Sequence, residues 1–164
     1  MKLELQLPGK LSKNNKDSFK KLFALLRRRR NSGDDVLVEA VHNELFANIN
    51  CLTCANCCKS HPPLIVEKDI ERISSHLKMK ETDFISKYVI LDEDGDFVFN
   101  FVPCVFLMSD NSCRIYNVRP KACKEYPHTN RKKIYQIESL TLVNSEICPA
   151  VIPILESISK SINL

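Results

Sequence analysis

Glycine is scarce in this 164-residue chain, which has three glycines beside eight prolines. Such a composition excludes a flexible or low-complexity protein. The chain has neither the G-x-x-x-x-G-K-S/T loop nor the G-x-G-x-x-G loop, the two glycine-rich patterns that cradle nucleotide phosphates. A serine-hydrolase motif is missing as well. The sequence therefore gives no support to nucleotide-driven or serine-based chemistry.

Long apolar runs are also missing. No run approaches the ~18–20 residues that a membrane span needs, so we expect no membrane association. The first eight residues, Met-Lys-Leu-Glu-Leu-Gln-Leu-Pro, lack the uninterrupted apolar core of a secretory signal. We therefore expect a cytoplasmic protein, in a compartment where thiols stay reduced.

The excess of positive charge is small. The 24 lysines and arginines exceed the 20 acidic residues by a net +4, and metal-bound thiolates would lower this charge further. The basic run Arg27-Arg-Arg-Arg30 has no interleaved aromatic residues, so we interpret it as a solvated helix end rather than a phosphate-binding patch. Nucleic acid is not an expected partner.

Cysteine, in contrast, is abundant. Four of the eight cysteines lie in Cys51-Leu-Thr-Cys54-Ala-Asn-Cys57-Cys58. The C-x-x-C spacing lets a short turn aim two sulfurs at one point, as zinc and iron–sulfur sites require, and thiolates select such soft metals over calcium or magnesium. Adjacent side chains diverge, so Cys57 and Cys58 are not expected to share one tetrahedron. Either the site is larger than a mononuclear centre, or Cys58 serves a second site.

The other four cysteines lie downstream in distinctive surroundings: Cys104 in Pro-Cys-Val-Phe-Leu, Cys113 in Cys-Arg-Ile-Tyr, Cys123 in Arg-Pro-Lys-Ala-Cys-Lys-Glu-Tyr-Pro, and Cys148 before a proline. In a reducing compartment, clustered cysteines favour metal ligands over disulfides, and closely spaced ones gain little from cross-linking. Redox or structural disulfides remain the alternative. We predict eight metal ligands: Cys51, Cys54, Cys57, Cys58, Cys104, Cys113, Cys123 and Cys148.

Together these motifs resemble those of the YkgJ-type cysteine-cluster proteins, whose domain is described as chelating zinc or iron. The resemblance rests on C-x-x-C-x-x-C-C, P-C-x-F-L, C-x-I-Y-x-x-R-P-x-x-C-x-x-Y-P and a late C-P, and it covers residues 51–149. It implies metal binding without fixing the metal or a reaction. Related cysteine clusters look like modules of some protein lysine methylases, which is an analogy only.

Eight cysteines permit two four-thiolate zinc sites, one polynuclear cluster with bridging sulfurs, or one iron–sulfur cluster with four ligands and the rest elsewhere. Three functions follow as hypotheses. The first is a metal-binding protein that chelates zinc or iron. The second is an iron–sulfur-dependent redox or transferase enzyme, and the third is a metal storage or transfer protein with a protein partner. Enzymatic activity is left open.

Other polar clusters are weaker metal candidates. His61 and His128 are less suited than any cysteine, because eight thiols are already available. Asp92-Glu-Asp-Gly-Asp96 fails the EF-hand pattern and is predicted to be a hairpin turn. Four cations surround the later cysteines, where they either compensate thiolate charge or bind an anion, or are simply solvated. They are Arg114, Arg119, Lys121 and Lys124.

The pattern predicts a small α+β protein, with N-terminal helices and a metal-stapled, cysteine-rich module that contains short antiparallel strands. We expect a single domain over residues 1–164, composed of a helical buttress (1–50), the cysteine module (51–150) and a C-terminal helix (151–164).

Periodicity predicts the individual elements. The expected elements are an extended arm at 1–11, helices at 17–30, 34–48 and 67–76, a short helix capped by Thr82, strands at 64–66 and around the acidic turn, a hairpin over 103–116, and strands at 134–137 and 139–143. A short helix after Pro120 should carry Cys123 in its first turn, where the helix dipole would favour a thiolate.

Overall fold

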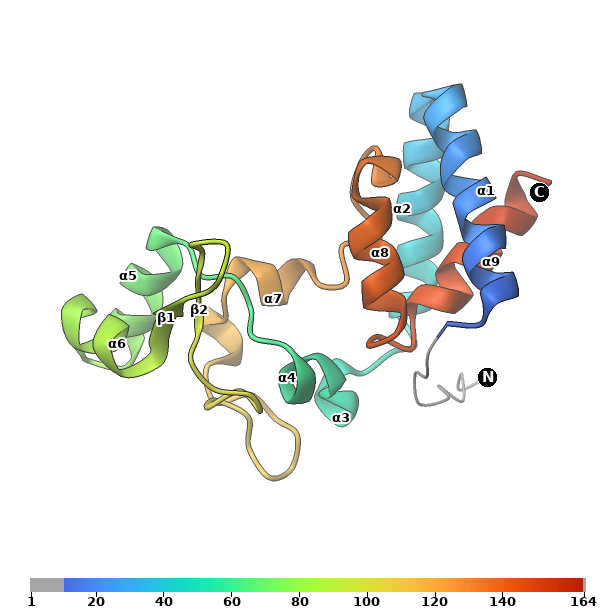
Figure 1. Cartoon of the computed structure of the whole chain (residues 1–164). Helices are drawn as coiled ribbons and strands as arrows, with labels where there is room; N and C mark the ends of the chain where they lie inside the picture. Colours follow the sequence, from blue (N-terminus) through green and yellow to red (C-terminus); the bar gives the residue numbers. More distant parts are fainter. Residues whose placement is uncertain (1–10, 164) are drawn as a thin grey trace. The chain divides into compact units, whose positions relative to one another are not determined.

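The computed structural model describes residues 11–163, which divide into two compact units (Figure 1). Of the described residues, unit 1 holds 11–50 and 127–163, and unit 2 is Cys51–Tyr126. Unit 2 begins at the expected start of the cysteine module, whereas residues 127–150, also expected in that module, belong to unit 1. The expected N-terminal arm lies, apart from Leu11, outside the described residues.

Most of the described chain is helical, and a two-stranded antiparallel sheet lies in unit 2, which fits the predicted α+β class. Across residues 11–163, no helix combines the length and the apolar character needed to cross a membrane.

Unit 1 is built from helices. They are α1 (Lys13–Arg29), α2 (Ser32–Phe46), the 3-10 helix η2 (Ile134–Ile137), α8 (Glu138–Ser145) and α9 (Val151–Ser161). The predicted stripe of α1 is buried, with Phe19, Leu22, Phe23 and Leu26 in one core with α2 and α9. Two of the basic residues at the end of α1 pair with carboxylates of unit 1: Arg27 with Glu138 at 2.8 Å and Arg29 with Asp34 at 3.0 Å.

Two predictions about helix starts in unit 1 are corrected by the capping side chains. Ser12 accepts a hydrogen bond from the Asn15 N–H at 3.2 Å, so α1 begins four residues before the expected position. Asn31 accepts from the Gly33 N–H at 2.9 Å and caps α2, so the prediction that Asp34 or Asp35 caps this helix is wrong.

The strands predicted at 134–137 and 139–143 are wrong, since these residues form η2 and α8. The buried face of α8 is polar: Thr141, Asn144 and Ser145 are buried there, whereas Leu140 and Val143 are 44% and 52% exposed. A helical period carried by polar residues is invisible to a search for apolar periodicity, so the apolar residues indicated a strand.

Unit 2 is made of short elements. They are α3 (Cys51–Cys54), α4 (Asn56–Ser60), α5 (Glu67–His76), α6 (Glu81–Tyr88), β1 (Val89–Leu91), β2 (Phe97–Phe99), the 3-10 helix η1 (Tyr116–Val118) and α7 (Lys121–Glu125). Helix α5 has the predicted bounds. The residue at the N-cap of α6 is Lys80 rather than Thr82, and its side chain makes no capping hydrogen bond.

The strands β1 and β2 pair antiparallel around the acidic turn, as predicted, with Ile90 opposite Val98. The Asp92 carboxylate accepts the N–H groups of Asp94 and Asp96 at 3.0 and 2.9 Å, so it holds its own turn. The strand predicted at 64–66 is reduced to one isolated bridge between Leu64 and Val98.

An aromatic cluster forms the core of unit 2. The rings of Phe99 and Phe106 meet edge to face with centroids 5.3 Å apart, and Phe84 packs on Phe99 at 6.4 Å. Cys104 and Cys113 pack against this core. The core therefore fixes the loop that carries two of the predicted ligands.

Candidate metal centre

The C-x-x-C-x-x-C-C motif folds as two short helices separated by a break. Cys51 and Cys54 lie at the two ends of α3, and Cys57 and Cys58 lie in α4. Between them Ala55 is buried and has a left-handed backbone with φ of 53°. The break reorients the chain, so the motif is presented as two pairs of cysteines.

Cys57 and Cys58 lie closer together than the sequence suggests. Their Sγ atoms are 4.0 Å apart, although adjacent side chains were expected to diverge. In a tetrahedral zinc site with Zn–S bonds of about 2.3 Å, two sulfurs are about 3.8 Å apart. The separation is therefore compatible with two ligands of one ion, although the pair was not expected to share a tetrahedron.

The predicted hairpin carries Cys104 and Cys113. Leu107 and Cys113 form an antiparallel bridge, and the Arg114 N–H donates to the Phe106 carbonyl at 2.9 Å. The Cys104 N–H donates to the Cys58 carbonyl at 2.8 Å and so ties the hairpin to α4.

A second contact joins the hairpin turn to α3. The Asn111 side-chain amide donates to the Thr53 carbonyl at 3.2 Å. Backbone and amide bonds therefore connect the hairpin to both cysteine helices.

Four thiols of unit 2 affect one another's charge. The pKa of Cys104 is influenced by Cys58 and Cys113, that of Cys113 by Cys58, and that of Cys123 by the other three. Every one of the six pairs in this set therefore interacts. We call Cys58, Cys104, Cys113 and Cys123 the central tetrad.

Burial dominates the chemistry of most of these thiols. It raises the pKa of Cys104 to about 11 and that of Cys123 to about 12, and it also raises the pKa of Cys113. Cys58 behaves in the opposite way, because a hydrogen bond from the Cys57 thiol lowers its pKa to about 7. At Cys123 burial raises the pKa, which is opposite to the direction that the dipole of α7 was predicted to favour.

The remaining predicted ligands are divided between the units. Cys51 is exposed, and Cys54 and Cys57 are half-buried. Partial desolvation of the Cys51 sulfur raises its pKa, and the Cys54 charge raises it further. Cys148 belongs to unit 1, where it packs against the helical core and its N–H donates to the Asn144 carbonyl at 2.8 Å. The structure thus brings seven of the eight cysteines into one unit.

The two candidate histidines lie in different units. His61 is exposed at the end of α4, and His128 is in unit 1 with φ of 66°. Within residues 11–163, no group of three or more histidine, cysteine or acidic side chains is arranged to hold a metal ion. The structure therefore does not show the expected metal staple.

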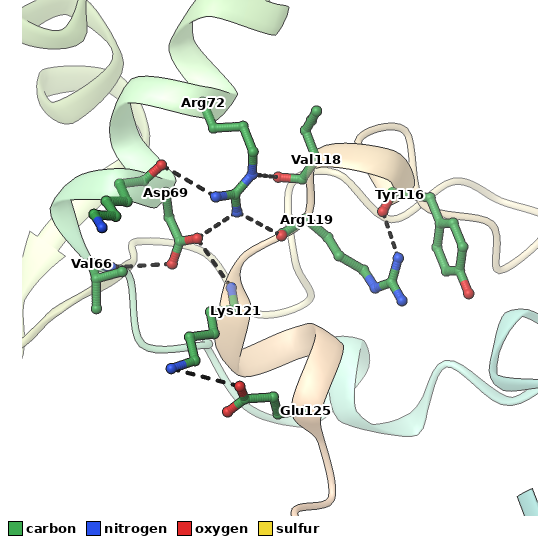
Figure 2. A network of polar contacts seen from close by, with 9 residues as sticks. Val66, Asp69, Arg72, Tyr116, Val118, Arg119, Lys121 and Glu125 are labelled. Atoms are coloured by element: carbon green, nitrogen blue, oxygen red, sulfur yellow. Dashed lines mark hydrogen bonds and ion pairs between the residues drawn. The ribbon is translucent and has the colours of Figure 1, made fainter.

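An ion pair in α5 was missed by the sequence analysis. Asp69 is buried at 1% exposure and accepts hydrogen bonds from Arg72, from the Val66 N–H at 3.3 Å and from the Lys121 N–H at 3.1 Å (Figure 2). The signal in the sequence was the position of Asp69 beside the apolar stripe of Ile70 and Ile73, which indicates burial. A buried carboxylate requires partners.

The described residues form a small α+β protein in which seven of the eight cysteines lie in unit 2. The family model CxxCxxCC, described as "Putative zinc- or iron-chelating domain", matches residues 50–149. That range is more than half of the chain and includes all eight cysteines, and the chain belongs to this family. No solved structure matches the chain.

Proposed function

We propose that the protein chelates zinc or iron through its cysteine thiolates, with the central tetrad as the principal site. The observation that carries this proposal is that unit 2 holds seven of the eight cysteines, with the hairpin tied to α4 by the bond from the Cys104 N–H to the Cys58 carbonyl at 2.8 Å. Four thiolates satisfy a closed tetrahedral zinc site and equally the ligand requirement of an iron–sulfur cluster. The family description supports zinc or iron without choosing between them.

The tetrad draws its ligands from three separate segments, namely α4, the hairpin and α7. These segments have little regular structure, and two of them are helices of five residues. A metal bound to all three would therefore contribute directly to the folding free energy of unit 2. This role explains why a unit with such short elements would use a metal centre.

The other cysteines of the motif form a set that adjoins the tetrad. Cys57 lies 4.0 Å from Cys58 between the Sγ atoms, and the Cys51 and Cys58 thiols interact electrostatically. We propose that Cys51, Cys54 and Cys57 bind a second ion, with Cys58 as a bridging ligand. Cys148 as the eighth ligand remains a prediction.

Metal transfer is a second candidate, and the exposure of Cys51 favours it. An exposed thiol at the edge of a thiolate cluster can bind a partner's metal before the buried ligands do. A protein partner for such a transfer is a hypothesis, as are the iron–sulfur enzyme and the cytoplasmic location.

Anaerobic purification, followed by metal and acid-labile sulfide analysis, tests the proposal. Zinc without sulfide supports a closed chelating module, and iron with sulfide supports a cluster. Cys104→Ser and Cys123→Ser should each lower metal content and the melting temperature of the loaded protein. Cys148→Ser should retain the ion of the tetrad. If neither tetrad variant alters metal content or stability, the assignment is wrong.

A further inference from the structure

One edge of the small sheet in unit 2 is open. Strand β2 pairs with one side of β1 (Figure 1), and no strand of the described residues pairs with the other side. The Asn100 N–H donates to the Tyr88 carbonyl at 3.0 Å, and because facing positions alternate in an antiparallel pair, the backbone groups of Ile90 also face β2. Those of Val89 and Leu91 therefore point toward the open edge.

The open edge carries both a free donor and free acceptors. The Val89 N–H is already used, because it donates to the Ile85 carbonyl at the end of α6. The Leu91 N–H and the carbonyls of Val89 and Leu91 have no hydrogen-bond partner among residues 11–163. Unpaired N–H and C=O groups along a strand edge are a template for a further strand.

An apolar row crosses one face of the sheet and ends at this edge. Ile90 lies opposite Val98, and Leu64 joins Val98 from the other side through the isolated bridge. Directly opposite residues share a face of a sheet, so the three side chains form one row. Val98 is buried in the middle, whereas Ile90 and Leu64 are 49% and 43% exposed. A strand added beside β1 would extend this row.

The two ends of β1 have opposite charges. Lys87 precedes the strand, and the acidic turn Asp92–Asp96 follows it. Both Lys87 and Glu93 are exposed, and neither forms an ion pair with another residue in the described part of the chain. When two β1 strands pair antiparallel, the positive end of each meets the negative end of the other. Parallel pairing would bring like charges together, which destabilises a sheet.

We propose that the open edge of β1 is a self-association surface, which pairs antiparallel with the β1 edge of a second copy of this chain and places Ile90 opposite Ile90 at a two-fold axis. In this register the free Leu91 N–H of each copy faces the free Val89 carbonyl of the other. Lys87 of each copy faces Glu93 of the other. The surface is thus self-complementary, as a symmetric dimer requires.

Pairing would also remedy a weakness of the isolated sheet. A two-stranded sheet gains little stability by itself, and the dimer joins two such sheets into one. The inference does not depend on metal binding, since it uses no cysteine.

The first test is sedimentation equilibrium of the full chain, purified anaerobically and kept reduced, over a series of concentrations. The parent should form a dimer, and Ile90→Lys should weaken it by about tenfold or more, because two like charges then face each other. The matched control is Val36→Lys, at an apolar position of α2 that is 67% exposed, and it should stay within about twofold of the parent. A parent that is monomeric throughout the series, or a dimer that Ile90→Lys leaves unchanged, would overturn the inference.

The second test is a charge exchange that checks the antiparallel register. Lys87→Glu and Glu93→Lys should each weaken the dimer by about three- to tenfold, because each change makes two like-charge contacts per dimer. The double variant should recover most of the loss, since it restores both attractive pairs with the signs exchanged. If the losses of the two single variants simply add in the double variant, the register is wrong.

Each variant must retain the circular dichroism spectrum of the parent, which checks its folding. Should Ile90→Lys fail this check, Leu91→Lys replaces it on the same edge, at a position that is 60% exposed. A dimer that resists all of these variants is joined by another surface or by a shared metal ion, which also overturns the inference. A chain that binds no metal but dimerises through β1 would refute the proposed function and leave this inference standing.

Discussion

Even at about pH 9.5, which is above the ordinary thiol pKa of 9.0, zinc binding to the central tetrad should release at least two protons. A ligating cysteine must be a thiolate, so every protonated ligand loses its proton on binding. The pKa of Cys104 is about 11 and that of Cys123 about 12, so both thiols are almost fully protonated at this pH. Four thiols with the ordinary pKa of 9.0 would together release about one proton there.

The same values set the sign and steepness of the pH dependence. Zinc affinity rises with pH for as long as binding releases protons, and it falls as the pH falls. With two protons released, the affinity changes by about 100-fold per pH unit. Below about pH 7, where Cys58 is protonated too, all four thiols release a proton and the dependence becomes steeper.

Calorimetry at one pH in two buffers of different ionisation enthalpy measures the number of protons released. The titration at about pH 9.5 is compared with one at about pH 6. At the lower pH the shifted pKa values and the ordinary pKa of 9.0 predict the same result, a release that approaches four protons. A release of about one proton at the higher pH would refute the argument that burial in unit 2 sets the thiol pKa values.

Two further predictions concern stability. Phe99→Ala should cost about 3–5 kcal/mol in the urea unfolding of the metal-free protein, because Phe99 is buried between Phe84 and Phe106, whereas Phe101→Ala at an exposed position should cost little; equal effects would contradict the assigned core. Asn31→Ala should lower the unfolding free energy by about 1 kcal/mol through loss of the α2 cap, and Asn31→Ser should preserve most of it; an unchanged Asn31→Ala protein would show that the cap contributes nothing.

Local patterns predicted the elements whose buried faces are apolar. The stripe of α1 and the bounds of α5 follow from helical spacing, and the turn between β1 and β2 follows from Asp-Gly chemistry. Helix α8 could not be found in this way, because its buried residues are polar and its exposed face includes Leu140 and Val143.

For the site, the sequence predicted the residue types but not their grouping. The C-x-x-C spacing indicates ligands, yet the interaction of Cys58 with Cys123 depends on how α4, the hairpin and α7 pack together. Such contacts join residues far apart in the chain, which spacing alone cannot reveal. The pKa values were equally out of reach, since burial rather than the local helix dipole determines that of Cys123.

The division of the chain has a consequence for unit 1, whose two parts are connected through the whole of unit 2. In chain-entropy terms, the helices before Asn50 and after Pro127 must close a long loop in order to pack. A metal held by Cys58 and Cys123 would shorten that loop to roughly a dozen residues, since both ligands lie near the ends of unit 2. The shorter loop lowers the closure cost by about 1–2 kcal/mol. Metal loading of one unit would thus stabilise the helical packing of the other through chain connectivity alone.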